Sequence, residues 1–176
     1  MTIPIVKDLS ISDLAAFIGG YLEQQGVDVV LVGGACVSIY SKHAYISGDL
    51  DLITYHEGKK IKEALSRIGF RFTKNNYFVH SESNFILEFV NPPAAIGRDA
   101  ITEFAQYKTN LGSIKLLTPT DCVKDRLTAY FYWNDEQSLE QALLVAREQT
   151  INLSLLEIWA KREKQLGKFS TFISLI

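Results

Sequence analysis

Two aspartates on one expected strand are the residues of this chain whose spacing points most directly to chemistry. Polar and apolar residues alternate in the segment 48–53, which reads GDLDLI. Since successive side chains of a β-strand point to opposite faces, Asp49 and Asp51 share one face and the leucines share the other. Two neighbouring carboxylates stay ionised at low cost only with a cation between them, and hard oxygen ligands suit Mg²⁺ or Mn²⁺. The strand therefore predicts a metal site.

A pair of glycines precedes the aspartates. The apolar segment 29–32 has the length and β-branched character of a strand and leads into Gly33 and Gly34, after which 35–42 is expected to be a helix. Glycine lets the backbone turn tightly, and the free N–H groups at the start of a helix bind anions. The order of strand, Gly-Gly turn and helix predicts a binding site for polyphosphate.

A third acid lies on a later expected strand, 85–90. Phe85, Leu87 and Phe89 share one face there, so Glu88 points to the opposite one. Glu88 is the candidate third carboxylate. The alternative is an ordinary exposed glutamate, and spacing alone does not choose between the two.

The combination of Gly33-Gly34, the spacer 35–48 and D-x-D flanked by Leu and Ile resembles the signature of the DNA polymerase beta-like nucleotidyltransferase superfamily. More narrowly, it resembles small bacterial nucleotidyltransferases of the abortive-infection toxin type. The resemblance covers 29–53 well and, more loosely, the order of elements to about residue 146. Ser47, two residues before Asp49, fits the pattern. Tyr45 departs from it, because many relatives have a basic residue there, and the spacer is long for the family.

This resemblance implies a metal-dependent transfer of a nucleoside monophosphate from a triphosphate such as ATP to a hydroxyl acceptor, with release of pyrophosphate. The acceptor could be RNA such as tRNA, a protein or a small molecule. Carboxylates from two strands would hold two cations, Mg²⁺ or Mn²⁺. The catalytic and metal-binding residues would then be Asp49, Asp51 and Glu88, and the nucleotide-binding residues Gly33, Gly34, Ser47 and Lys124.

Lys124 is included because of its place on a helix. The expected helix 119–133 buries Val123, Leu127, Tyr130 and Phe131, and Lys124 emerges at the border of that face. Related nucleotidyltransferases often carry a lysine on the helix after the core sheet. The alternative is a surface lysine paired with Asp121 or Thr128, in which case the substitutes are Arg126, Lys115 and Arg98.

The hydrophobic periodicity predicts an α+β fold, and the resemblance implies a nucleotidyltransferase-like mixed β-sheet flanked by helices, followed by a C-terminal helical bundle. We expect residues 1–117 to form the α/β core and 118–176 a helical region packed on it. Tyr132 and Trp133 are expected in the core. The apolar tail should pack on the body or on a second subunit. The expected elements are a first helix that Ser10 or Ser12 caps and Gly26 ends, further helices at about 35–42, 57–68, 119–133, 135–149 and 153–166, and strands at 29–32, 49–55, 70–73, 77–80, 85–90, 104–108 and 113–117. The strands within 70–90 should form a meander and those within 104–117 a hairpin at the sheet edge, with a loop beginning at 91–93. Asn134 and Asn152 are expected to cap the C-terminal helices.

Composition narrows the class of protein. The chain has 176 residues, 47% of them hydrophobic, enough for one substantial core. No apolar run is long enough to span a membrane and the N-terminus lacks a signal-peptide core, so a cytoplasmic protein is expected. The net charge of −2 argues against broad nucleic-acid binding. Cys36 and Cys122 are expected to be buried, without a disulfide or a metal.

Two rival hypotheses remain open. The chain could be a nucleotidyltransferase fold without turnover, acting as a binding module or as part of a toxin-antitoxin pair, with an antitoxin or a second copy as partner. Tyr45 favours this hypothesis, whereas the three intact acids favour catalysis, because buried acids without a metal are costly. The other rival is a plain α+β scaffold in which both the D-x-D and the Gly-Gly are incidental.

Overall fold

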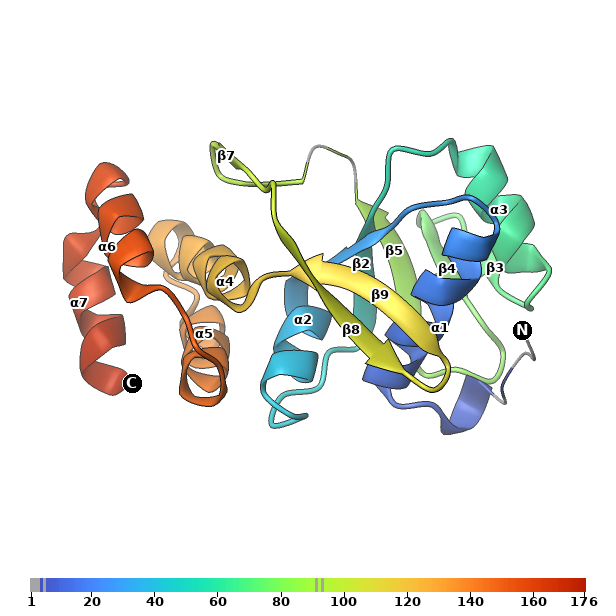
Figure 1. Cartoon of the computed structure of the whole chain (residues 1–176), viewed down its shortest axis with the longest axis horizontal. Coiled ribbons are helices and arrows are strands. Elements are labelled where there is room, and N and C mark those ends of the chain that lie inside the picture. Colours follow the sequence, from blue (N-terminus) through green and yellow to red (C-terminus); the bar gives the residue numbers. More distant parts are fainter. Residues whose placement is uncertain (1–3, 5, 91, 93) are drawn as a thin grey trace.

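The computed structural model describes residues 4, 6–90, 92 and 94–176. A mixed sheet of seven strands lies at one end of this described chain and a group of four helices at the other (Figure 1). The strand order is β3-β4-β5-β2-β1-β9-β8. The strands are β1 (Val30–Val32), β2 (Asp49–Ile53), β3 (Arg71–Phe72), β4 (Tyr77–Val79), β5 (Ile86–Val90), β8 (Phe104–Thr109) and β9 (Gly112–Leu117), with β6 (Ala95–Ile96) and β7 (Asp99–Ala100) forming a separate hairpin.

In the described part of the chain, three α-helices pack against the sheet, and four more continue beyond it. A 3-10 turn, Val6–Asp8, precedes α1 (Ile11–Gln24), whose first turn is capped by the Ser10 side chain. The helices α2 (Gly33–Tyr40) and α3 (Gly58–Ser66) complete the sheet region, and α4 (Pro119–Trp133), α5 (Glu136–Glu148), α6 (Leu153–Arg162) and α7 (Leu166–Leu175) form the C-terminal group. Within the described residues, no helix is both long and apolar enough to cross a membrane.

The centre of the sheet combines both strand directions. β1 is antiparallel to β2 and parallel to β9, and β2 is parallel to β5. On one face, the registered residues Leu31, Leu52 and Leu116 are buried in a core that also contains Leu14 and Ile18 of α1. Because side chains alternate along a strand, this burial leaves the aspartates of β2 on the opposite face.

These observations confirm the expected fold class, the α1 cap, the antiparallel β3-β4-β5 meander and the hairpin that ends in the edge strand β8. Both cysteines are buried free thiols, as expected. The apolar tail packs on the body through Phe169 and Phe172 of α7. The division at residue 117 stays a prediction, although α2 contacts both α4 and α5.

Three local expectations were wrong. Tyr132 and Trp133 are 49% and 74% exposed, because Tyr130 and Phe131 fill the inner face of α4 and the helix ends directly after Trp133. The expected cap Asn134 is confirmed as the left-handed C-cap of α4, whereas the N-cap of α5 is Asp135. The expected loop after β5 contains the β6-β7 hairpin, and the last expected helix ends early at Arg162, before Lys164 with its φ of 59°.

The helix α1 lies unusually close to β9. A methyl group on Gly19 would lie 2.6 Å from the Ser113 carbonyl oxygen and 2.7 Å from Cβ of Ile114. Both neighbours are main-chain or Cβ atoms, which cannot rotate away. The absence of a side chain at Gly19 therefore sets the distance between helix and sheet.

We predict that Gly19→Ala lowers the free energy of unfolding by about 1–3 kcal/mol, because overpacking would displace α1 from β9. Gly167→Ala is the matched control, since Gly167 is also helical and has open space around it. It should leave stability unchanged or raise it by up to about 1 kcal/mol. Urea unfolding of both variants gives the comparison, and equal stabilities would contradict the close packing.

Candidate active site

Three carboxylates meet where β2 and β5 run side by side. In this parallel pair Asp51 is in register with Glu88 and Asp49 with Ile86. One carboxylate oxygen from each of Asp49, Asp51 and Glu88 lies within 4.8 Å of the others. The aspartates are half-buried and Glu88 is exposed, so the cluster lies at the surface of the sheet. The structure thus brings together the acids that the sequence analysis selected.

Asp51 carries the electrostatic cost of this arrangement. Burial raises the pKa of Asp51 to about 6, and the neighbouring charges of Asp49 and Glu88 add to the effect. The positive charge of Arg126 on α4 lowers it in part. A cation among these oxygens would relieve the repulsion, and three hard oxygen donors are a suitable ligand set for Mg²⁺ or Mn²⁺.

The Gly-Gly turn lies directly against the cluster. Val32 is the registered neighbour of Asp51, and Gly33 follows it with a φ of 68°, a conformation that favours glycine. A methyl group on Gly33 would collide with Oδ2 of Asp51. The first turn of α2, with its free N–H groups, therefore begins beside the carboxylates.

Ser47 connects the turn to the first aspartate. Its side chain is 4% exposed, and its hydroxyl donates a hydrogen bond of 2.7 Å to Oδ1 of Asp49. The Ser47 N–H donates to Oγ of Ser38 on α2, at 2.9 Å. A methyl group on Gly34 would lie 2.8 Å from Oγ of Ser47. Ser47 thus fixes the orientation of Asp49 against the Gly-Gly turn.

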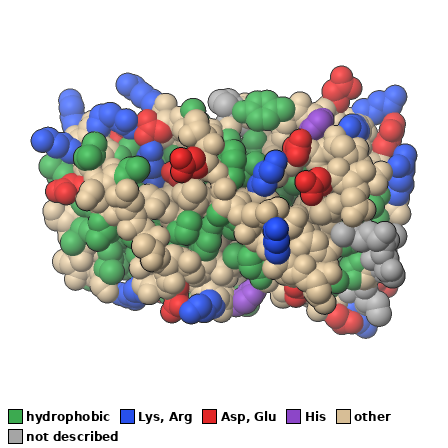
Figure 2. Space-filling model, in the orientation of Figure 1, with side chains coloured by type: hydrophobic (Ala, Val, Ile, Leu, Met, Phe, Trp, Pro, Cys, Tyr) green, Lys and Arg blue, Asp and Glu red, His purple; other side chains and the backbone are tan. Residues whose placement is uncertain are grey.

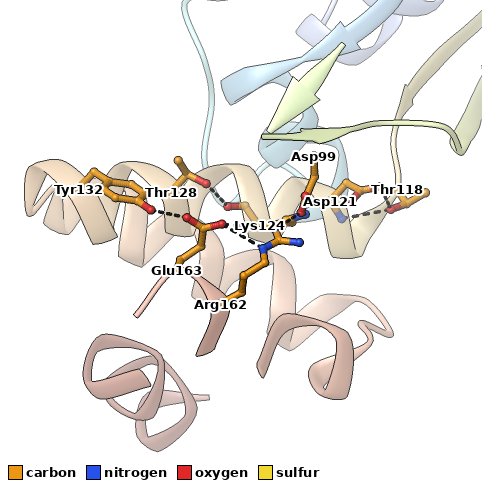
Figure 3. Close-up of polar contacts among 8 residues, drawn as sticks. All are labelled: Asp99, Thr118, Asp121, Lys124, Thr128, Tyr132, Arg162 and Glu163. Carbon is orange, nitrogen blue, oxygen red and sulfur yellow. Dashed lines mark hydrogen bonds and ion pairs between the residues drawn. The ribbon is translucent and has the colours of Figure 1, made fainter. Parts of the chain in front are cut away.

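Lys124 is bound to an acid that the sequence analysis did not name. It is 5% exposed, and its ammonium donates to Oδ2 of Asp99 on β7 at 2.5 Å, where Arg162 also donates at 2.6 Å (Figure 3). Neither of the expected partners pairs with the ammonium: Asp121 accepts from Thr118, and Thr128 donates to the Lys124 carbonyl.

Asp99, Lys124 and Arg162 border a cavity of about 580 Å³ between the β6-β7 hairpin and α6. Lys124 also faces the ring of Trp159, at 5.5 Å from its centroid. Asp99 therefore joins the hairpin to α4 and α6. The role of Lys124 at the triphosphate stays a prediction, and it would require the ammonium to leave Asp99.

Of the three substitutes for Lys124, Arg126 is the one whose charge acts on Asp51. Its guanidinium is held by Oδ2 of Asp125 and by Oε1 of Gln141 on α5, at 3.3 Å. Arg98 lines the 580 Å³ cavity, and Lys115 lies 3.5 Å from Asp28 on the surface. One feature of the sequence could have indicated Arg126 as a residue near the site. Arg126 lies one helical turn after Cys122, on the side of α4 that faces the core.

Charged side chains elsewhere do not form a field of one sign on the face shown in Figure 2. Acidic and basic side chains alternate across it, with a local group of basic ones at the end formed by α6 and α7. This mixed pattern agrees with the net charge of −2.

No protein-family profile and no curated protein matches the sequence. Solved structures do share the fold. An antigenic nucleotidyltransferase-like protein from Paracoccidioides brasiliensis matches with a TM-score of 0.62 and 11% identity over 93% of both chains. The antibiotic-resistance factor ANT(2'')-Ia matches with a TM-score of 0.50 and 14% identity over 94% of both chains. The chain therefore has a nucleotidyltransferase-like fold.

We predict that Asp51→Asn stabilises the metal-free protein at neutral pH. An unfolded aspartate loses its proton near pH 4, whereas folded Asp51 does so near pH 6, so the free energy of unfolding falls as pH rises through this window. After allowing for solvent screening, the gain should be about 1 kcal/mol, or about 2–4 °C in Tm, at pH 7.5, and smaller at pH 5. Thermal unfolding with a chelator measures it. The exposed Asp28→Asn is the control, and an equal gain at both pH values would contradict the assignment.

We also predict an asymmetry within the Asp99 ion pair. Asp99→Asn leaves the buried Lys124 ammonium without a charged partner and should cost about 2 kcal/mol or more. Lys124→Met leaves Asp99 with Arg162 and should cost less. The urea midpoints of the two variants decide the point, and the reverse order would show that Asp99 depends on Lys124 instead.

Proposed function

We propose that this chain is a metal-dependent nucleotidyltransferase, which moves a nucleoside monophosphate from a nucleoside triphosphate to a hydroxyl acceptor and releases pyrophosphate. One observation supports this function above the others. The register of Asp51 with Glu88 places three carboxylates together, and Gly33 at the start of α2 lies against the same cluster. Acids for a cation and amides for phosphate are then side by side, within a nucleotidyltransferase-like fold.

The donor set fits magnesium or manganese, and Asp49, Asp51 and Glu88 would hold the metal. When bound, the cations would supply positive charge to the triphosphate and lower the pKa of the acceptor hydroxyl. The half-burial of the two aspartates limits competition from water, and the mutual repulsion of the acids favours occupation by a cation.

The other residues of the chain would bind and orient the substrate. The free amides that open α2 at Gly33 and Gly34 would donate to phosphate oxygens, and Ser47 would hold Asp49 in place. In the reaction, the acceptor oxygen forms a bond to the α-phosphorus and the bond to the β-phosphate oxygen breaks. Pyrophosphate leaves with that electron pair, and a carboxylate of the cluster takes the acceptor proton. We assign the neighbouring positive charge to Arg126 first and to Lys124 second.

The acceptor belongs to one of three classes: RNA such as tRNA, a protein hydroxyl, or a small molecule. The resemblance of 29–53 to abortive-infection nucleotidyltransferases supports a toxin that has an antitoxin partner or forms a homodimer. The fold shared with ANT(2'')-Ia, an antibiotic-resistance factor, supports a small-molecule acceptor. An assay of transfer should therefore include all three classes.

We predict label transfer with release of pyrophosphate when the protein is incubated with Mg²⁺, each of four labelled triphosphates, and total RNA, lysate protein or small hydroxyl compounds. Asp49→Asn and Asp51→Asn should each lower the rate about a hundredfold or more, because each removes a metal ligand. Asp28→Asn, an exposed aspartate on another part of the surface, should keep the parent rate. Release of inorganic phosphate in place of pyrophosphate would overturn the proposed reaction.

A second candidate function is a binding module without turnover. Two observations favour it: Tyr45 replaces the basic residue expected before the D-x-D, and Lys124 is engaged by Asp99. In that case the protein would bind a triphosphate with Mn²⁺ in calorimetry, while no acceptor class would receive label. Transfer to any acceptor that is lost in Asp51→Asn would exclude this candidate.

A further inference from the structure

The loop between α2 and β2 brings one more polar group, the Tyr45 hydroxyl, to the Gly-Gly turn. We infer that the hydroxyl of Tyr45 is the side-chain hydrogen-bond donor to the triphosphate at this turn. The inference rests on the proposed function, because it assigns a role within the same site.

The position of the hydroxyl is the first observation. A methyl group on Gly34 would lie 3.4 Å from Oη of Tyr45 and 2.8 Å from Oγ of Ser47, so both hydroxyls lie on the same side of the turn. The Tyr45 ring is half-buried and packs against the hydrophobic core. The ring is thus anchored, and its hydroxyl lies beside the first turn of α2.

The second observation concerns which hydroxyl protons remain free. Ser47 donates its proton to Oδ1 of Asp49, and Ser38 donates to the Gly34 carbonyl oxygen at 3.3 Å. Across the described residues, the Tyr45 hydroxyl makes no hydrogen bond, and no fully buried side-chain oxygen or nitrogen lacks a partner. Oη of Tyr45 is therefore not fully buried. Of these three hydroxyls, Tyr45 alone has a proton to offer a ligand.

The third observation is that the start of the loop contacts α1 on one side and α5 on the other. Nε2 of His43 lies 3.1 Å from Oγ of Ser12 on α1, and Lys42 forms a 2.7 Å salt bridge with Glu148 on α5. The Tyr45 N–H donates to Oγ of Ser41 at 3.3 Å. A donor held in advance by its surroundings loses little freedom on binding, which favours a contribution to affinity.

A neutral phenol gives this site a distinct signature. It donates one hydrogen bond to a phosphate oxygen and adds no positive charge, so it acts on the phosphates without changing the charge around Asp49 and Asp51. Loss of the hydroxyl should weaken phosphate binding. It should not change the binding of a metal ion alone.

The test is calorimetry with the preformed complex of Mn²⁺ and inorganic tripolyphosphate, which presents the phosphates without a base or sugar. Tyr45→Phe removes only the hydroxyl and should weaken binding about tenfold to a hundredfold, the effect of one hydrogen bond to a charged acceptor. Tyr107→Phe is the matched control. Tyr107 is another half-buried tyrosine packed on the core, but it lies on the edge strand β8. Its variant should bind as the parent does.

Two further measurements separate a binding role from a structural one. Tyr45→Phe should keep the parent Tm, and it should bind Mn²⁺ without tripolyphosphate as the parent does. Unchanged tripolyphosphate affinity would overturn the inference while leaving the proposed transfer reaction intact. A parallel loss of metal binding or of Tm would also overturn it, by marking the hydroxyl as structural. If the parent does not bind the complex, the inference fails, and the transfer assay with labelled triphosphates then decides the proposed function separately.

Discussion

The parallel register of β2 and β5 is the constraint on which the candidate site depends. It places Asp51 beside Glu88, and the alternation of side chains adds Asp49 to the same face. Like charges at this distance oppose folding, and burial of Asp51 increases the cost. The arrangement persists because the other face of the same strands buries Leu50 and Leu87 completely, so a slip of one residue would expose the core. The packing of one face holds the acids of the other together.

The C-terminal helices are connected to the sheet region through α2. The Tyr40 hydroxyl donates to the Leu117 carbonyl oxygen just before α4, and the Gln149 side chain donates to the Tyr40 carbonyl oxygen at 2.9 Å. The same helix α2 begins at the Gly-Gly turn. Contacts at the C-terminal end of α2 thus tie the helix that opens at the candidate phosphate site to Leu117, just before α4, and Arg126 of α4 brings its charge to Asp51.

Local periodicity was sufficient to predict much of this site, because a period of two assigns Asp49, Asp51 and Glu88 to faces without knowledge of the tertiary structure. The partner of Lys124 could not be predicted in this way. Helical spacing placed Lys124 at the border of the inner face of α4, but Asp99 reaches it from a hairpin after a proline-rich segment, and Arg162 from a distant helix. The exposure of Trp133 was missed for a related reason, since it depends on where α4 ends and on which neighbours approach it. Long-range packing decides both, and sequence spacing does not encode it.

The contact between Gly33 and Asp51 has a consequence for how steady the site can be. Only hydrogen fits between the main chain of Gly33 and the Asp51 carboxylate, so van der Waals contact limits how the spacing of these two groups can change. Most binding sites set such spacings with side-chain rotamers, which exchange on fast timescales. Here close packing holds the Asp51 carboxylate at a short distance from the main chain of the Gly-Gly turn. Thermal motion of the surface loops should therefore change the distance between Asp51 and the Gly33 main chain very little.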